Sequence, residues 1–342
     1  MRAATFREYG GPGVMLWEEV DDPVPGPDEV VIEVRACGLN HSDLDSRAGT
    51  SRWPFTMPWV LGAEFAGRVA AVGADVEGIA PGDPVTAYQQ YSCGTCTACT
   101  RWRQDLCERF VVFGTDRWGG YAELATVPAR AVIPLEGDDE FIPAAAAQCV
   151  ASTAWSMVTS VAGVRAGETV LVPSASGGVA GAAVQAAVIA GARVIASVGA
   201  SEKAAAVWGL GADVVFCYLE TPVAEAVAEA TGGRGVDVVV DTTGGPRFPE
   251  HLAAMAPDGR LVTCGAHAGE VVPLDIIELF RHGHRILGFR AATPDEIQTA
   301  LQMALDGRIS VPVDRTFRLS DASDAHAYMD DRRHVGKIVL VP

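Results

Sequence analysis

The sequence predicts an α/β protein made of two units, a compact barrel-like β unit and a parallel sheet covered by helices. Short apolar segments broken by Gly and Pro fill residues 1–135, a pattern typical of a small all-β unit. Continuous apolar strands alternate with helical segments over residues 136–290, which is typical of a parallel sheet buried on both faces. Residues 291–342 predict two strands that return to the first unit.

The β unit is recognised from alternation and turn residues. Val30–Val34 alternates as a half-buried strand does, and Gly67–Gly73 is a second strand that ends in Gly. Pro81–Val85 is a turn that leads into a further strand. These signals recur at short intervals, so we expect many short strands rather than a few long ones.

The second region begins with an Ala-rich helical stretch at Pro143–Val161. The strands expected after it are Thr169–Pro173, Arg193–Ser197, Val236–Asp241, Arg260–Cys264 and Arg285–Phe289. The helices expected between them are Gly178–Ala190, Ser201–Leu210 and Phe248–Met255. The tail predicts a helix from Pro294, a strand at Arg315–Leu319, a short helix and a last strand at Lys337–Val341.

Composition limits the possible partners. The chain has 342 residues, of which 49% are hydrophobic and 20% charged, as in ordinary globular domains. Its net charge of −17 makes nucleic acid and anionic membranes poor partners. No apolar run approaches the ~20 residues that span a bilayer, and Met1–Glu8 lacks an apolar signal core. We therefore expect a soluble, cytoplasmic protein that acts on a small molecule.

Four of the eight cysteines form the motif Cys93-x2-Cys96-x2-Cys99-x7-Cys107. Four thiolates on a short loop suit tetrahedral Zn²⁺ and leave no position for water, so the sequence predicts one structural zinc per chain. A ferredoxin loop is a rival, but its last spacing is shorter and its last Cys precedes Pro, whereas Glu108 follows Cys107. Free thiols or disulfides are the other alternative. Outside the cluster, Cys149, Cys217 and Cys264 are expected to be buried small hydrophobes.

A glycine-bearing loop, Ser174–Gly181, joins an apolar strand to a helix. Such a loop holds a dinucleotide pyrophosphate at the helix N-terminus, with Ser176, Gly177, Gly178 and Val179 as the predicted contacts. The motif is degenerate because Ala175 and Ala180 replace two of its glycines. A turn that serves packing alone is the alternative, but the following strand–helix units supply the context that the motif requires.

The end of the second strand bears on the choice between NAD and NADP. An acidic residue there binds the ribose 2′-hydroxyl of NAD, but this sequence has Val198 at that position. A site without the acid would tolerate a 2′-phosphate, with Ser201 and Lys203 as candidate contacts and Glu202 pointing into solvent. The sequence therefore favours NADP(H) over NAD(H).

Together these features resemble the medium-chain dehydrogenase/reductase superfamily over essentially the whole chain. The motifs that carry the resemblance, besides the cysteine cluster and the loop, are Ala36–Asp43 (ACGLNHSD), Gly62-Ala63-Glu64, Pro81-Gly82-Asp83 and Gly119–Glu123 (GGYAE). The resemblance implies a GroES-like β-barrel catalytic domain over 1–135 with a zinc lobe at 93–107. It also implies a Rossmann doubly wound parallel sheet for NADP over 136–290, before the return over 291–342.

The resemblance adds further expectations. His41, Thr153 and Gly265 are predicted cofactor contacts, with His41 on the pyrophosphate. A homodimer or homotetramer joined near Ile286–Phe289 is also implied.

The family's zinc alcohol dehydrogenases hold a catalytic zinc with Cys, His and Cys. The matching positions here are Asn40, Ala63 and Cys149, and Cys37 lies three positions before the first of them. One thiolate beside Glu64 does not supply the three ligands of a catalytic zinc, so we predict none. In this respect the sequence resembles the zinc-independent quinone oxidoreductase branch that keeps the structural cysteine lobe.

Without a Lewis acid, alcohol oxidation is harder, because nothing lowers the pKa of the alcohol. The sequence therefore favours an NADPH-dependent reductase of a quinone, enone or activated carbonyl. Asn40, Ser42 and Tyr88 are candidate donors to the developing oxyanion, and Asp45 would make the pocket more polar. Each also has a purely structural alternative, such as a backbone hydrogen bond for Asn40. Two other functions stay open: an alcohol dehydrogenase with an atypical metal site, and a non-catalytic NADPH-binding sensor or scaffold.

Overall fold

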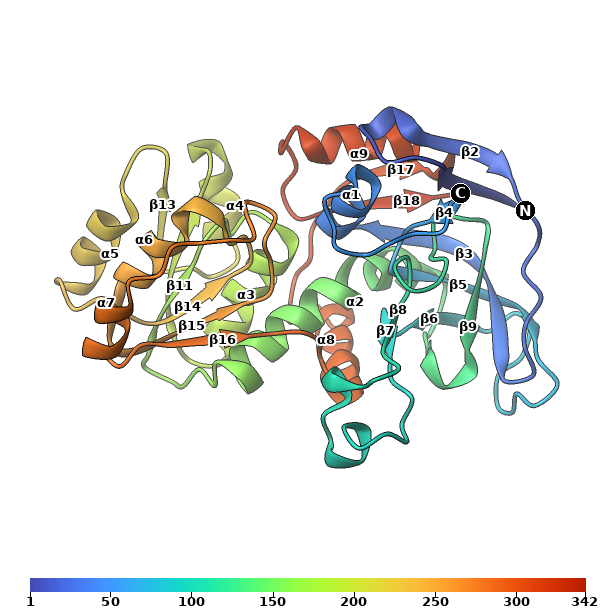
Figure 1. The fold of residues 1–342 in the computed structure, drawn as a ribbon, viewed down its shortest axis with the longest axis horizontal. Helices are drawn as coiled ribbons and strands as arrows, with labels where there is room; N and C mark the ends of the chain where they lie inside the picture. Colours follow the sequence, from blue (N-terminus) through green and yellow to red (C-terminus); the bar gives the residue numbers. More distant parts are fainter. The chain divides into compact units, whose positions relative to one another are not determined.

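The computed structural model describes residues 1–342, which divide into two compact units (Figure 1). Unit 1 contains Met1–Cys149, Thr293–Asp306 and Pro312–Pro342, and unit 2 contains Val150–Ala292 and Gly307–Val311. Most of the tail, Thr293–Asp306 and Pro312–Pro342, thus belongs to the same unit as the N-terminal residues. The boundaries differ from the predicted 135 and 290, because residues 136–149 belong to unit 1 and a short segment of the tail belongs to unit 2.

Unit 1 is organised around a seven-stranded sheet in the order β10-β6-β5-β3-β18-β17, with β9 also paired to β3. Its strands are β3 (Glu29–Leu39), β5 (Glu64–Val72), β6 (Pro84–Ala87), β9 (Leu124–Pro128), β10 (Val132–Pro134), β17 (Val313–Arg318) and β18 (Lys337–Val341). The smaller sheets pair β1 (Arg2–Phe6) with β2 (Met15–Glu19) and β4 (Trp59–Val60), and β7 (Gln90–Tyr91) with β8 (Val111–Val112). The many short strands confirm the predicted β-barrel-like unit.

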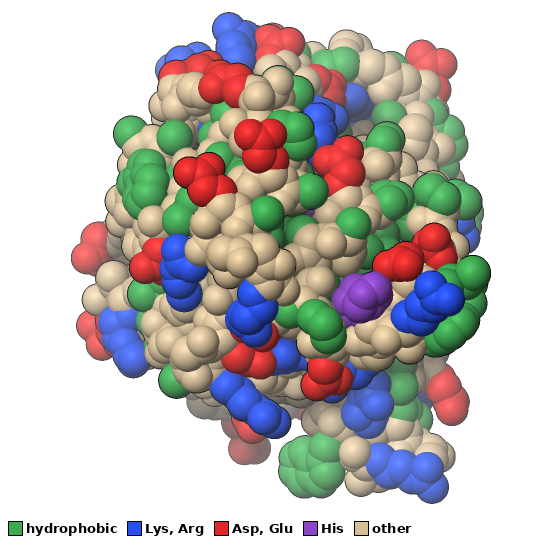
Figure 2. All heavy atoms as spheres, turned by 90° about the vertical axis from the view of Figure 1, so that its left-hand side faces the viewer, with side chains coloured by type: hydrophobic (Ala, Val, Ile, Leu, Met, Phe, Trp, Pro, Cys, Tyr) green, Lys and Arg blue, Asp and Glu red, His purple; other side chains and the backbone are tan.

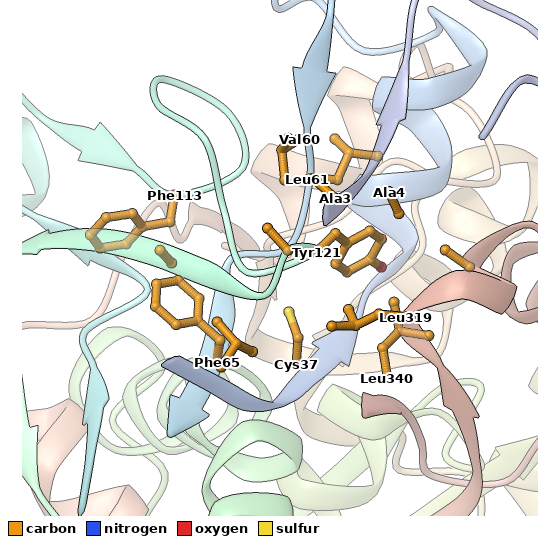
Figure 3. Packing of buried hydrophobic residues seen from close by; sticks show 14 of the residues in the cluster. Ala3, Ala4, Cys37, Val60, Leu61, Phe65, Phe113, Tyr121, Leu319 and Leu340 are labelled. Atoms are coloured by element: carbon orange, nitrogen blue, oxygen red, sulfur yellow. The ribbon is translucent and has the colours of Figure 1, made fainter. Parts of the chain in front are cut away.

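The core of unit 1 lies against β3 and β5 (Figure 3). Phe65 on β5 packs edge-on against Phe113 with ring centroids 5.5 Å apart, the geometry that aromatic quadrupoles favour. Tyr121, Cys37 and Leu340 complete the same cluster and are fully buried. Each such side chain contributes roughly 2 kcal/mol when it leaves water, so this cluster is a main source of the stability of unit 1.

The helices of unit 1 are α1 (His41–Ala48), α8 (Pro294–Leu305), α9 (Ala322–Asp330) and the first part of α2 (Phe141–Ser156). Helix α2 continues into unit 2 and runs into a π-helical segment, Met157–Val161. The stretch Asp138–Val161 is long and apolar enough to cross a membrane, but 72% of its most apolar window is buried inside the molecule. That degree of burial is what core packing produces in a globular protein.

Unit 2 contains a six-stranded sheet in the order β13-β12-β11-β14-β15-β16, and every pair is parallel. The strands are β11 (Thr169–Val172), β12 (Arg193–Val198), β13 (Val214–Cys217), β14 (Val236–Asp241), β15 (Met255–Thr263) and β16 (Arg285–Gly288). The order reverses direction between β11 and β14, which is the doubly wound topology that binds dinucleotides at the carboxyl ends of the strands. The Rossmann prediction is confirmed.

The connecting helices of unit 2 are α3 (Gly178–Ile189), α4 (Ala204–Trp208), α5 (Val223–Thr231), α6 (Phe248–Ala253) and α7 (Ile276–Arg281). Helix α3 is apolar around most of its surface, and eight of its twelve residues are buried. Two short 3₁₀ turns, Ser201–Lys203 and Gly245–Arg247, follow β12 and β14. These turns place polar side chains at the carboxyl edge of the sheet.

Strand β16 is an edge strand, and apolar side chains around it are exposed, among them Ile286 on the strand and Ile276, Ile277 and Phe280 on α7. An apolar edge of this kind is a candidate surface for pairing with another chain. Figure 2, turned so that the left-hand side of Figure 1 faces the viewer, shows acidic and basic side chains interspersed with apolar ones. The predicted homodimer or homotetramer near Ile286–Phe289 stays a prediction.

A bidentate ion pair ties the loop before β11 to β15 within unit 2. Arg260, 8% exposed, donates to both carboxylate oxygens of Glu168 at 2.9 and 2.8 Å and to the Gly163 carbonyl at 2.9 Å. The pairing with Arg260 is the main cause of a lowered pKa at Glu168. Its Nε also donates to the Ala162 carbonyl. Because the guanidinium satisfies four acceptors at once, it fixes the entry of the first Rossmann strand.

We expect Arg260→Leu to lower the stability of unit 2 by about 3 kcal/mol, because it leaves a partly buried carboxylate and two carbonyls without their donor. The matched control is Arg285→Leu on the neighbouring strand. Arg285 is 52% exposed and pairs with Asp258 at 3.3 Å, so its loss is expected to cost no more than about 0.5 kcal/mol. Urea unfolding followed by circular dichroism measures both, and equal midpoints for the two variants would contradict the assignment.

Candidate active site

Three strand ends of unit 1 meet beside the start of α1. Strand β3 ends at Leu39, and Asn40 is the N-cap of α1. Strand β18 pairs antiparallel with β3, with Ile338 opposite Leu39. Lys337 therefore lies beside Asn40. Strand β5 begins at Glu64, opposite Gly38. Strand pairing therefore brings together three polar side chains that are far apart in the sequence.

The side chains of Asn40, Glu64 and Lys337 form a closed network. Lys337 Nζ donates to Asn40 Oδ1 at 2.7 Å, to the Leu39 carbonyl at 2.8 Å and to Glu64 Oε1. Asn40 Nδ2 donates to Glu64 Oε1 at 2.9 Å, and the Cys149 backbone N–H donates to Glu64 Oε2 at 2.7 Å. Glu64 and Lys337 are both buried. Every ammonium proton has an acceptor, so this buried charge pair is fully satisfied.

Gly38 makes room for this network. A Cβ at this position would lie 2.2 Å from the Ala145 carbonyl and 2.6 Å from Glu64 Oε1. Only glycine lets β3 approach both α2 and the carboxylate so closely. The close approach of β3 to α2 and to Glu64 thus explains the glycine of the ACGLNHSD motif.

Asp43, on the first turn of α1, ties the site to the neighbouring loop. Its carboxylate accepts hydrogen bonds from the Asn40 N–H at 2.9 Å, the Gly62 N–H at 3.3 Å and the Tyr121 hydroxyl at 3.2 Å. Burial raises the pKa of Asp43 to about 6 despite these donors. The hydrogen bonds hold the N-terminus of α1 in one orientation.

The structure places the predicted donors at one edge of the sheet. Within the network, the side-chain oxygen of Asn40 accepts one hydrogen bond and one of its two Nδ2 hydrogens is donated, which leaves the second Nδ2 hydrogen to donate. Ser42 is exposed two residues further on, and His41 is half-buried with its ring 6.1 Å from that of His334. Asp45 is half-buried, and its carbonyl accepts from the Thr50 and Ser51 N–H groups at the end of α1.

Tyr88 follows β6 on the same edge. Strand β5 aligns Ala66 with both Ala36 of β3 and Thr86 of β6, which puts Tyr88 level with Gly38 two strands away. The backbones of Gly38 and Tyr88 are therefore separated by two strand spacings, or about 10 Å. The Tyr88 hydroxyl accepts from Gln298 Nε2 at 2.6 Å and keeps its own proton to donate. Burial raises the pKa of Tyr88, so the phenol is a neutral donor.

In unit 2 the loop between β11 and α3 fits a pyrophosphate. Gly177 is the N-cap of α3 and makes no side-chain cap, so the N–H groups of the first turn have no side-chain partner. Ser174 has a φ of +54°, which turns the chain sharply into the helix. The predicted Ser176, Gly177, Gly178 and Val179 therefore lie at the positive end of a twelve-residue helix, where an anion is stabilised.

A cavity of about 330 Å³ lies beyond the carboxyl ends of β14, β15 and β16. It is lined by Gly244, Phe248, Thr263, Cys264, Gly265, Ala266, Gly269, Glu270, Val272 and Phe289. The predicted Gly265 belongs to it, and a Cβ there would lie 2.0 Å from the Thr242 carbonyl. Burial raises the pKa of Cys264 to about 12, so its thiol is neutral. The cavity lies on the β14 side of the topological reversal, where the second half of a dinucleotide would extend.

The structure corrects one predicted cofactor contact. Val198, the last residue of β12, is fully buried, so its side chain packs in the core and cannot reach a ribose. The next residue, Gly199, lies under the Tyr218 hydroxyl, and Ser201 Oγ donates to Glu220 Oε1 at 2.6 Å. Lys203 is half-buried in the same turn, and Thr153 is half-buried on α2.

Sequence reasoning missed six polar residues. Lys337 was seen only as the start of a strand, and Tyr218, Glu220, Arg247 and the buried Asp241–His251 pair were not singled out. A cation before an apolar strand was the one available signal for Lys337. Tyr218 and Arg247 come from strands three apart in the sheet, a proximity that sequence spacing does not reveal.

The four cysteines converge in a loop of unit 1. Their Sγ atoms all lie within 4.8 Å of one another, and the shortest separations are 3.5 Å for Cys96–Cys99 and 3.9 Å for Cys93–Cys99 and Cys96–Cys107. A tetrahedral Zn–S₄ site with bonds of about 2.3 Å has S···S edges of about 3.8 Å. No disulfide forms. The Thr95 N–H hydrogen bond is the main cause that lowers the pKa of Cys93 to about 5, which favours the thiolate. These four residues could hold a metal ion.

Two family descriptions match the chain, the alcohol dehydrogenase GroES-like domain over residues 26–137 and the zinc-binding dehydrogenase over residues 178–306. The acryloyl-coenzyme A reductase of Metallosphaera sedula is 33% identical over 94% of this chain and 95% of its own length. The quinone oxidoreductase of Pseudomonas aeruginosa is 31% identical over 98% of each chain. The chain belongs to the medium-chain dehydrogenase/reductase superfamily.

Solved structures support the same family assignment. An NAD-dependent alcohol dehydrogenase matches with a TM-score of 0.94 and 38% identity over the whole of both chains. The Escherichia coli quinone oxidoreductase complexed with NADPH matches with a TM-score of 0.85 and 26% identity, also over both whole chains. The chain is therefore an NAD(P)-dependent oxidoreductase of the alcohol dehydrogenase and quinone oxidoreductase type.

The residues at the family's catalytic-zinc position do not fit a zinc ion. Asn40 and Ala63 supply neither a thiolate nor an imidazole, and both Glu64 oxygens already accept hydrogen bonds from Lys337, Asn40 and Cys149. A catalytic zinc needs three protein ligands and an open position. We therefore derive no step through a metal at this site.

We expect Lys337→Met to destabilise unit 1 by about 3–5 kcal/mol, because it leaves the buried Glu64 carboxylate without its counter-charge. The double variant Lys337→Met/Glu64→Gln should recover most of that loss, since a neutral amide needs no counter-ion. Thermal unfolding of the wild type, both variants and a Lys203→Met control measures this. A single variant no less stable than the control would show that the pair does not hold the site together.

Proposed function

We propose that the protein is an NADPH-dependent reductase of conjugated acceptors, a quinone, an enone or a related activated carbonyl, and that it works without a catalytic zinc. The observation that carries the proposal is the closed Lys337–Glu64–Asn40 network at the family's metal position. Without a Lewis acid, nothing lowers the pKa of an alcohol substrate. A conjugated acceptor needs no such activation, because its C=C bond is already polarised by the carbonyl.

Two relatives support this class of substrate. The acryloyl thioester named for the Metallosphaera sedula enzyme and the quinone named for the Pseudomonas aeruginosa enzyme both contain a C=C bond conjugated to a carbonyl. In both, hydride addition to the β-carbon moves the C=C electron pair toward the carbonyl oxygen. The carbon or oxygen that then carries the charge takes a proton from water.

NADPH, when bound, supplies the hydride, and the protein orients the acceptor and stabilises charge on its oxygen. Three donors on the edge of the unit 1 sheet are available for that oxygen: the remaining Asn40 N–H, the Ser42 hydroxyl and the Tyr88 hydroxyl. The raised pKa of Tyr88 keeps its proton in place at neutral pH. Donors fixed before the reaction stabilise a developing oxyanion without reorganisation.

The preference for NADPH rests on the end of β12. Neither Val198 nor Gly199 is an acid that could bind a ribose 2′-hydroxyl, and Ser201 and Lys203 follow in the next turn. The Escherichia coli quinone oxidoreductase structure contains NADPH, whereas the alcohol dehydrogenase of similar structure is named NAD-dependent. The residues at the end of β12 in this chain support our proposal of a bound 2′-phosphate.

The cysteine cluster supports a structural zinc of the proposed enzyme. We expect wild-type protein to contain about one zinc per chain, and Cys96→Ser to contain almost none, because a hydroxyl is a poor fourth ligand in a thiolate site. Cys149→Ser is the matched control and should keep its zinc. Metal analysis by mass spectrometry after dialysis measures all three. Two zincs per chain, with one lost in Cys149→Ser, would instead favour an alcohol dehydrogenase with an atypical metal site.

We expect NADPH consumption with a naphthoquinone, an enone and an acryloyl thioester, and at least a tenfold lower rate of NADP-dependent oxidation of a simple primary alcohol. Tyr88→Phe should lower kcat for the conjugated acceptors by about 10- to 100-fold through loss of an oxyanion donor. The control Tyr91→Phe removes a hydroxyl that contacts Arg117 and should leave kcat unchanged. Tight NADPH binding without turnover on any acceptor would favour the sensor or scaffold.

A further inference from the structure

The end of β12 in unit 2 is shaped by a tyrosine from the neighbouring strand. The Tyr218 N–H donates to the Val198 carbonyl at 3.0 Å, which extends the β12–β13 pairing to Tyr218. A Cβ on Gly199 would lie 2.7 Å from the Tyr218 hydroxyl. No side chain, and in particular no carboxylate, fits at Gly199 while Tyr218 keeps this position. The hydroxyl therefore lies over the residue that follows Val198, the position where NAD enzymes have their acid.

Arg247 lies flat on this tyrosine. Its guanidinium carbon is 4.5 Å from the centroid of the Tyr218 ring, although Arg247 follows β14 and Tyr218 follows β13. One N–H donates to Glu250 Oε2 at 3.2 Å, and the other donors on the rim of the guanidinium make no hydrogen bond within the chain. Stacking fixes the plane of a guanidinium and leaves its edge free for two parallel hydrogen bonds to a phosphate.

A carboxylate competes at the same place. Ser201 Oγ donates to Glu220 Oε1 at 2.6 Å, and both residues are exposed. Glu220 lies two residues after Tyr218, and its negative charge is held against the Ser201 hydroxyl, which a 2′-phosphate would need. A phosphate that enters must displace the carboxylate from Ser201 and tolerate its charge.

We infer that Arg247, with Tyr218 as its platform, selects NADP(H) by binding the 2′-phosphate, and that Glu220 weakens the same interaction. The chemical class recognised is a phosphate monoester on the adenosine ribose. The inference deepens the proposed NADPH preference and rests on it. It assigns the preference to a loop after β14, on the far side of the topological reversal from β12 and β13.

The experiment measures dissociation constants of NADPH and NADH by quenching of protein fluorescence, without any acceptor. Arg247→Met keeps an unbranched apolar stem on the ring but removes the charge, and it should weaken NADPH binding about 10- to 100-fold. NADH binding should change less than about twofold, because NADH lacks the phosphate. Glu220→Gln should tighten NADPH binding about three- to tenfold and leave NADH binding unchanged.

Arg234→Met is the matched control, because Arg234 is an exposed arginine of the same unit that pairs with Asp237. It should alter neither constant. Equal weakening of both cofactors by Arg247→Met would overturn the inference and place Arg247 against the adenine instead. No change with either cofactor would also overturn it. Absence of turnover on every acceptor would count against the proposed reaction alone, since the binding constants are measured without substrate.

Discussion

The buried pair of Lys337 and Glu64 is the constraint on which the architecture of unit 1 depends. It joins the ends of three strands, β3, β5 and β18, and through the Cys149 N–H it reaches α2. Two charges buried together are costly unless all their hydrogen bonds are made, and here they are. The glycine at position 38 follows from this need, because a larger residue would collide with the carboxylate.

The same pair decides what chemistry the site can support. A metal ion at this position would be an exchangeable Lewis acid, whereas the ammonium of Lys337 is fixed by three acceptors and is shielded from solvent. Its positive charge neutralises Glu64, and its hydrogen bond orients Asn40. In the reaction that we propose, hydroxyl and amide donors stabilise the oxyanion, and Tyr88 is a buried neutral phenol among them. Reduction of a conjugated acceptor suits such donors.

The other two sites are built from loops that a rigid scaffold holds in place. In unit 1 the cysteine loop brings four sulfurs to tetrahedral spacing. In unit 2 the loops after β12, β13 and β14 bring Ser201, Tyr218 and Arg247 to one place at the carboxyl edge of the sheet. The scaffold supplies the position, and we propose that the side chains of the loops supply cofactor and metal specificity.

The sequence by itself determined the two fold types, the cysteine cluster and the glycine-bearing loop before α3. Each depends on local spacing: the strand period, the helix N-terminus, and four cysteines within fifteen residues. It also located the altered metal position, by the identities of Asn40 and Ala63. Only the tertiary structure supplied Lys337, which lies 273 residues from Glu64, and the pairing of Tyr218 with Arg247. It also showed that Val198 is buried. Such contacts are set by strand order and register, which join residues from distant strands and leave no periodic signal in the chain.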